Sequence, residues 1–357
     1  MRGLVPVEPV ATDDGLSLPL RRAAVSRPKG SALLLHGGTA GSTTFETPAG
    51  GGLVAYLNAE GVDVWTLDWR GGNLVGGTQT GPRPGPPVEF SISASAALDV
   101  PPTVKRIRET MTREGRGGQP LGVLGHCLGG GVIAASVAEG HLTGPLAIDR
   151  LVLSALGLFY ASPWDGAVKV QDFIIEQVCS ANPRSATIDT GVPSRFPAPM
   201  DASYAAWPQA LRFRCGSEIC AELSFMFGHP FLEENLADGI HDDAHLVGLF
   251  NHMPMEMYLH CGQNLRRGFY ARFDETEDQV RCPAPDPTHF TMPVTLATGE
   301  RNMLWHRDAI DRMHEWLRSN RVTRVTKHVF RGYAHQDLFW GRSSAKDVFG
   351  VFCAGLG

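Results

Sequence analysis

Residues 121–139 read LGVLGHCLGGGVIAASVAE, and this stretch decides the predicted fold. The apolar run Pro120–Gly125 is typical of a strand that is buried on both faces of a parallel sheet. Glycines on both sides of Cys127 permit a tight turn, and the apolar stretch Leu128–Glu139 has the length of a helix. The sequence therefore predicts a strand, a sharp turn and a helix in immediate succession.

Cys127 stands at the tip of this predicted turn. A cysteine in the pattern Gly-x-Cys-x-Gly, between a buried strand and a helix, is typical of a nucleophile held in strained geometry above the end of a sheet. The first amides of the helix, from Leu128 onward, would face the sulfur and favour a thiolate or an oxyanion. The alternative is a small core residue, because free cysteine is among the most buried residue types. The strand–turn–helix context favours the nucleophile.

Further apolar runs predict the rest of the sheet. They are Ser31–His36, Val62–Asp68, Arg150–Leu156, Pro293–Thr298 and Thr323–Arg331. Helical stretches accompany them at Pro101–Glu114, Trp305–Asn320 and Ser344–Ala354. Alternating strands and helices predict an α/β fold with a mostly parallel sheet flanked by helices.

The middle of the chain lacks the hydrophobic pattern of the flanking parts. Strand-like alternation disappears, Pro, Met, Cys and His are scattered, and short helical pieces such as Glu218–Phe227 and Asp242–Phe250 take over. We therefore predict a core formed by residues 1–160 and 291–357, with an inserted, mostly helical cap at 161–290. A separate middle domain is disfavoured because neither flanking part looks complete without the other.

Two loops that follow predicted strands supply further candidates. The turn His36–Thr39 contains two glycines, and the backbone N–H of Gly38 could converge with that of Leu128 to form an oxyanion hole. His335 follows the last predicted strand, where a general base that comes late in the chain is expected. Nucleophile first and histidine last is the chain order that favours His335 among 13 histidines.

The loop Gly299–Trp305 should supply the residue that orients this histidine. Asn302 stands where an acid is expected, and Glu300 is the alternative acid. An asparagine can accept the imidazole N–H without supplying charge, as in Cys-His-Asn enzymes. This suits a thiol, which needs less activation than a hydroxyl. The alternative reading of Asn302 is a cap for the helix predicted from Trp305.

Together these motifs resemble the α/β-hydrolase superfamily, over most of the chain outside residues 160–290. The segment Gly299–Ile310 looks like the acid loop of acid lipases, with Asn302 in place of their Asp. The segment Gly332–Gly341, GYAHQDLFWG, resembles the histidine stretch of the same lipases. The resemblance implies an α/β-hydrolase fold and carries His335 over as the base.

Two other likenesses concern the elbow. Gly-His-Cys-Leu-Gly-Gly at residues 125–130 and Asp68-Trp69-Arg70 are similar to motifs of polyhydroxyalkanoate synthases, which move acyl groups through a cysteine thioester. The closest overall likeness is to the hydrolase modules associated with cholesterol-oxidase-like flavoproteins, which also carry a His-Cys-x-Gly elbow and an Asn in the acid loop. That family supports the fold and the site better than it supports a substrate.

The expected activity is acyl transfer. Cys127 would attack an ester, thioester or lactone, His335 would move the proton, and the acyl group would leave to water or to an acceptor. The enzyme would be a thioesterase, an esterase or an acyltransferase, acting without a cofactor on a small-molecule or carrier-bound acyl substrate. The alternative is a catalytically degenerate hydrolase that serves as a binding or scaffolding partner.

Three methionines of the cap, Met253, Met255 and Met257, are candidates for substrate binding. Together with Phe250 and Tyr258 they would form an adaptable apolar surface for an acyl chain. Ordinary packing within the cap is the equally weighted alternative.

Composition narrows the partners. With 32 Lys and Arg against 37 Asp and Glu, the net charge of −5 disfavours nucleic acid. No stretch has the roughly 20 apolar residues of a membrane span.

Seven irregularly spaced cysteines and the absence of a visible signal peptide predict a cytoplasmic protein with reduced thiols. His241 and His245 have a zinc-compatible spacing but lack the accompanying Glu, so no metal is expected. The oligomeric state stays open, a homo-oligomer included.

Overall fold

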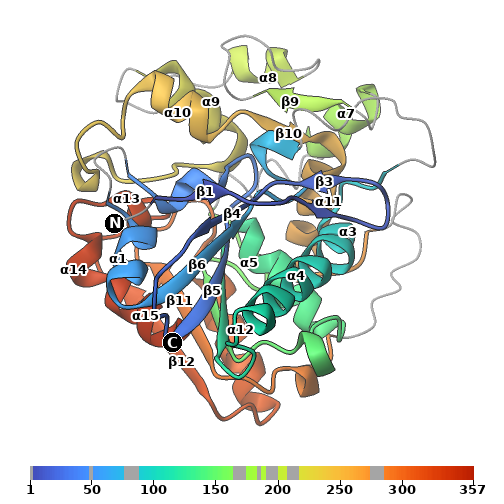
Figure 1. Cartoon of the computed structure of the whole chain (residues 1–357). Helices are drawn as coiled ribbons and strands as arrows, with labels where there is room; N and C mark the ends of the chain where they lie inside the picture. Colours follow the sequence, from blue (N-terminus) through green and yellow to red (C-terminus); the bar gives the residue numbers. More distant parts are fainter. Residues whose placement is uncertain are drawn as a thin grey trace.

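The computed structural model describes residues 3–47, 51–75, 88–163, 174–182, 186–189, 200–206, 217–273 and 285–357. An eight-stranded sheet crosses the molecule in the order β1-β4-β6-β5-β7-β8-β11-β12 (Figure 1). Its strands are β1 Val5–Pro6, β4 Leu20–Ala23, β5 Gly30–Leu35, β6 Val62–Leu67, β7 Leu121–His126, β8 Arg150–Ser154, β11 Val294–Gly299 and β12 Val325–Phe330. Neighbouring strands run parallel from β6 to β12, whereas β4 and β1 join antiparallel at one edge. The predicted, mostly parallel sheet is confirmed.

Side-chain alternation along the strands builds a core on each face of the sheet. Every residue of β5, β6 and β7 is buried, as continuous apolar runs predict. Because successive side chains point to opposite faces, Leu33 and Leu35 enter one hydrophobic cluster and Leu34 enters the other.

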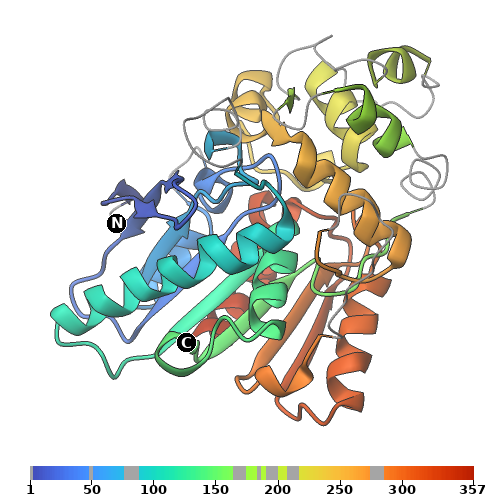
Figure 2. The same cartoon turned by 90° about the vertical axis from the view of Figure 1, so that its right-hand side faces the viewer.

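Helices cover both faces (Figure 2). The first face is covered by α4 Val100–Arg113, α5 Leu128–Ala138 and α12 Asp308–Ser319. The second face is covered by α1 Leu53–Ala59 and α15 Phe349–Leu356. In α12 the buried residues recur at three- and four-residue spacing, which is the apolar stripe that the sequence predicts.

Two predicted helices differ from the structure at their ends. The helix expected from Trp305 begins only at Asp308, and the backbone N–H of Trp305 bonds to the side chain of Asn302 in the preceding loop. The helix expected at 344–354 is interrupted at Val348, which has a φ of −119° and separates α14 Ser344–Asp347 from α15. Interrupting the helix lets α15 pack against β7 and β8.

Between β8 and β11 the described segments gather above the end of the sheet where the parallel strands finish (Figures 1 and 2). We call the described residues from 174 to 273 the cap segments. They contain α7 Ile174–Ala181, β9 Thr187–Asp189, α8 Met200–Ala206, α9 Glu218–Phe227, α10 Asp243–Leu249, β10 His252–Pro254 and α11 Met255–Arg267. The boundaries 161–290 of the cap stay a prediction.

Candidate active site

Cys127 lies in the tight turn between β7 and α5, with a φ of 56° and a ψ of −132°. A positive φ is a strained conformation for a residue with a side chain. The turn closes because its neighbours are glycines. An added Cβ at Gly125 would lie 2.5 Å from the carbonyl oxygen of Gly129, and one at Gly129 would lie 2.4 Å from that of His36. Backbone packing of this closeness requires glycine, and it lifts the thiol above the sheet.

The loop after β5 lies directly against the thiol. A Cβ at Gly37 would be 2.9 Å from the Cβ of Cys127 and 3.2 Å from its Sγ. The backbone amides of Leu128 and Gly38 both act on this sulfur and favour its thiolate form. Two backbone N–H groups from different loops thus act on the sulfur of Cys127.

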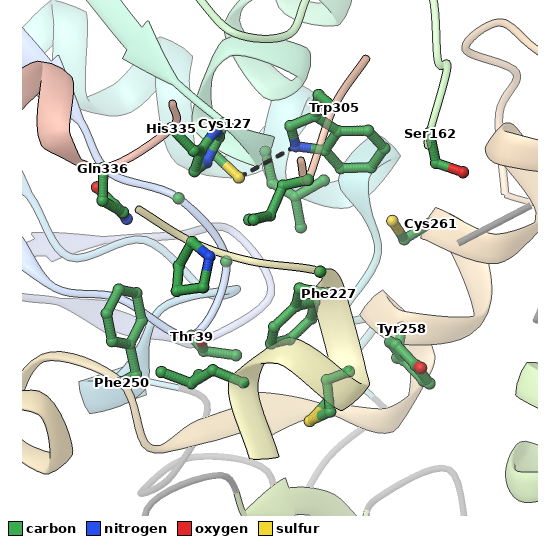
Figure 3. Close-up of a pocket in the computed structure, with 18 of the residues that line it drawn as sticks. Thr39, Cys127, Ser162, Phe227, Phe250, Tyr258, Cys261, Trp305, His335 and Gln336 are labelled. Atoms are coloured by element: carbon green, nitrogen blue, oxygen red, sulfur yellow. Dashed lines mark hydrogen bonds between the residues drawn. The ribbon is translucent and has the colours of Figure 1, made fainter. Parts of the chain in front are cut away.

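A third donor to the sulfur comes from Trp305. Its indole Nε1–H donates to the Sγ of Cys127 at 3.2 Å (Figure 3). The ring is nearly buried, and Tyr160 packs edge-on against it with ring centroids 5.5 Å apart. From the sequence, Trp305 is expected only at the start of a helix. No local pattern reveals this contact, because the two residues are 178 positions apart.

Burial outweighs these three donors. It raises the pKa of Cys127 to about 11, although the indole of Trp305 and the amides of Leu128 and Gly38 each lower it. The side chain of Cys127 is therefore a neutral thiol at rest, not a thiolate.

His335 lies between β12 and α13 Asp337–Trp340 and lines the same pocket as Cys127 (Figure 3). Its ring packs at a tilt of 36° against that of His126, the residue before Cys127, with centroids 4.4 Å apart. Neither ring nitrogen of His335 has a hydrogen-bond partner among the described residues. Burial lowers the pKa of His335 to about 3, so the imidazole is a neutral proton acceptor.

The two candidates for the third triad position do not contact His335. The Oδ1 atom of Asn302 accepts the backbone N–H groups of Leu304 at 3.0 Å and Trp305 at 3.2 Å, and its Nδ2 reaches Thr298. The exposed carboxylate of Glu300 accepts the backbone N–H of Gly332 at 3.2 Å. Asn302 thus holds backbone N–H groups of its own loop, and it does not cap α12, which begins at Asp308.

The segment after β6 supports the loop that carries Gly38. The Oδ1 of Asp68 accepts the backbone N–H of Ser42 at 2.7 Å and faces Nε2 of His36 at 3.5 Å. The indole N–H of Trp69 donates to the carbonyl of His36 at 3.0 Å. Both ends of the loop are thereby hydrogen-bonded to the segment that follows β6.

A cavity opens beside the thiol, and its empty space together with the solvent at its mouth amounts to about 840 Å³. Its lining is Gly37, Gly38, Thr39, Cys127, Leu128, Ser162, Ile175, Leu223, Met226, Phe227, Gly228, Pro230, Phe250, Tyr258, Cys261, Leu265, Leu304, Trp305, His335 and Gln336. None of these lining residues is Asp, Glu, Lys or Arg. The cavity therefore suits an uncharged, largely apolar ligand.

The methionine group lies outside this lining. Met253, Met255 and Met257 are buried, and the Sδ-methyl group of Met253 lies 3.7 Å from where a Cβ on Gly38 would be. Cap residues of α9 and α11, such as Met226 and Tyr258, form the wall in their place. The three methionines belong to the buried hydrophobic cluster that also contains Leu33 and Leu35.

The other candidates from the sequence have ordinary roles. Nε2 of His241 contacts the sulfur of Cys220 at 3.1 Å. Among the described residues, no group of three or more His, Cys, Asp or Glu side chains is arranged to hold a metal ion. Within the same residues, none of the helices combines the length and apolar character needed to cross a bilayer.

Comparison with known proteins places this geometry in context. A family model described as "Alpha/beta hydrolase family" matches residues 32–350. No curated protein sequence matches the chain. The likenesses to polyhydroxyalkanoate synthases and to modules beside cholesterol-oxidase-like flavoproteins therefore stay predictions.

Several solved structures share the fold. A soluble variant of monoglyceride lipase from Saccharomyces cerevisiae is 16% identical, with a TM-score of 0.59 over 99% of this chain and 94% of that chain. A lipase in its open form is 13% identical, with a TM-score of 0.60 over 99% and 97%. A carboxyl esterase from Bacillus coagulans is 12% identical, with a TM-score of 0.60 over 99% and 98%. At these identities the likeness concerns the fold alone.

Proposed function

Because the chain belongs to the alpha/beta hydrolase family, we propose that it is an acyl-transfer enzyme with Cys127 as nucleophile and His335 as base. The observation that carries the proposal is the convergence of N–H donors on one strained thiol. The amides of Gly38 and Leu128 and the indole of Trp305 all act on Sγ of Cys127. A cysteine that served only as core packing would not need three donors at its sulfur.

The first half of the reaction forms an acyl-cysteine. The sulfur of Cys127 attacks the carbonyl carbon while the thiol proton passes to His335. The amides of Gly38 and Leu128 stabilise the oxyanion that develops on the carbonyl oxygen. The tetrahedral intermediate collapses, the bond to the alcohol or thiol leaving group breaks, and that group takes the proton from His335.

The second half releases the acyl group. His335 removes a proton from a water molecule, whose oxygen attacks the thioester carbon. The carbon–sulfur bond breaks, the proton returns to the sulfur of Cys127, and a carboxylic acid leaves. An alcohol, amine or thiol acceptor in place of water would make the same chemistry an acyl transfer.

The cavity indicates the substrate class. A charged acyl group would lose its hydration shell against a wall without a charged partner, which costs several kcal/mol. Aromatic and aliphatic side chains such as Phe227, Phe250 and Leu223 favour an uncharged hydrocarbon chain. We propose an ester or thioester of an apolar carboxylic acid, free or attached to a carrier.

A hydrolysis assay tests the nucleophile and the substrate class together. We expect the protein to cleave p-nitrophenyl esters of straight-chain acids about 100-fold better than matched esters whose chain ends in a carboxylate. Cys127→Ala should abolish cleavage. Cys353→Ala, which removes a half-buried thiol on α15, is the matched control and should leave it unchanged. Full activity in Cys127→Ala would refute the nucleophile. Tight binding of the same esters without any cleavage would favour the degenerate, ligand-binding alternative.

A further inference from the structure

The loop between β11 and α12 contacts the nucleophile, not the base. The sequence predicts that Asn302, or alternatively Glu300, orients His335. The polar atoms of both residues instead form hydrogen bonds with other groups. The side chain of this loop that does reach a catalytic group is Trp305, at the sulfur of Cys127. This contact indicates that the loop acts on the nucleophile and not on the base.

We propose that Trp305 is a catalytic residue that stabilises negative charge on the sulfur of Cys127 through its indole N–H, and that Asn302 is the positioning residue that holds Trp305. This assignment rests on the proposed acyl transfer. It deepens that function by giving the loop its own role in the reaction.

The first argument is that the sulfur has no cationic partner. His335 is neutral, and no Lys or Arg stands among the described residues that line the cavity. Negative charge develops on the sulfur as its proton passes to His335, and apart from the imidazolium formed in that step only neutral N–H donors meet this charge. A hydrogen bond to a charged acceptor in a water-poor site is stronger than one between neutral groups.

The second argument concerns which donor stays on the sulfur. Once a substrate binds, the amides of Gly38 and Leu128 are needed at its carbonyl oxygen, as in any oxyanion hole. The indole of Trp305 belongs to a different loop and remains at the sulfur. It can therefore act twice, when the thiol attacks and again when the sulfur is expelled from the acyl-enzyme.

The third argument is how firmly the indole is held. Tyr160 packs edge-on against the ring, and the side-chain oxygen of Asn302 holds the backbone N–H of Trp305. Asn302 itself is 3% exposed and is anchored through Nδ2 to Thr298 of β11. A neutral amide suits this buried position because a carboxylate there would add negative charge near a sulfur that must itself become negative.

Trp305→Phe tests the inference, because it keeps an aromatic ring against Tyr160 and removes only the N–H donor. The readout is the rate at which iodoacetamide alkylates Cys127 at a fixed mildly alkaline pH, followed by mass mapping of the Cys127 peptide. Loss of one charge-assisted hydrogen bond should slow alkylation about 10- to 100-fold. With a p-nitrophenyl ester, acylation and deacylation should both slow while KM changes little. Trp316→Phe is the matched control, since Trp316 packs between Phe159 and Phe290 away from the thiol.

An alkylation rate within twofold of the wild type in a folded Trp305→Phe variant would overturn the inference. If that variant does not fold, Asn302→Ala decides. Loss of the acceptor for the Trp305 backbone should slow alkylation about fivefold, and an unchanged rate would overturn the proposal. Alkylation needs no acyl substrate, so a failure of the proposed acyl transfer remains distinguishable from a failure of this assignment.

Discussion

Cys127 and His335 are both uncharged at rest, and this state determines how two reactions of the thiol respond to pH. Burial lowers the pKa of His335 to about 3, so the imidazole can accept a proton at any pH above that value. The rate of acylation by a neutral ester should therefore stay level from roughly pH 5 to pH 8. An ordinary histidine would lose its base function toward the acidic end of this range. Stopped-flow release of p-nitrophenol across this range measures it.

Alkylation by iodoacetamide should behave differently because it requires the thiolate. Burial raises the pKa of Cys127 to about 11, and the alkylation rate should rise about tenfold per pH unit up to that value. A shared inflection near pH 6.5 in both profiles would contradict this account. It would indicate a preformed thiolate–imidazolium pair in place of two neutral groups.

Residue identities around the site were predictable only where the signal is local. Cys127, Gly38, Leu128 and His335 follow from short motifs at the ends of strands, and the structure brings all four to one cavity. The role of Trp305 was not predictable, because it depends on a side-chain contact between distant parts of the chain.

At the scale of elements, the segment after β6 determines where the Gly37–Gly38 loop lies. Trp69→Phe should remove the hydrogen bond to the carbonyl of His36, costing about 1 kcal/mol of stability. The substitution should lower kcat and change KM much less, because the displaced loop carries one of the two proposed oxyanion donors.

Trp65→Phe is the matched control for this prediction. Trp65 lies in β6 and donates to Asp63, a carboxylate that two arginines also hold. Its loss should cost similar stability without altering kcat. Chemical denaturation and steady-state kinetics on both variants measure the two effects. Equal kinetic effects in the two variants would show that the Trp69 bond has no special bearing on the loop.

The six parallel strands of the sheet were predictable to within one or two residues from their apolar runs, whereas the short edge strands β1 and β4 were not predicted. Helix boundaries were less predictable. The start of α12 is displaced to Asp308, and residues 302–305 form a loop in which the side chain of Asn302 accepts the backbone N–H groups of Leu304 and Trp305. Propensity and periodicity do not reveal such side-chain bonds, which form only when the loop closes.

At the scale of the whole molecule, the sheet carries the proposed catalytic groups and the cap segments supply most of the apolar wall. Cys127, His335 and the amides of Gly38 and Leu128 all lie at the finishing ends of parallel strands, where loops from β5, β7 and β12 meet. The cap segments cover that edge with Met226, Phe227 and Tyr258. The methionines expected to bind substrate are buried in the core and are not among the residues that line the cavity, since periodicity does not tell which side of a cap helix faces the cavity.

Trapping the acyl-enzyme tests the central claim most directly. The protein is mixed with a p-nitrophenyl ester of an apolar straight-chain acid, quenched in acid within the first turnover and analysed by intact mass and peptide mapping. The account predicts one added acyl group on Cys127, present in Cys353→Ala and absent in Cys127→Ala. Turnover with the acyl group on any other residue, or with none on Cys127 at any quench time, would contradict it.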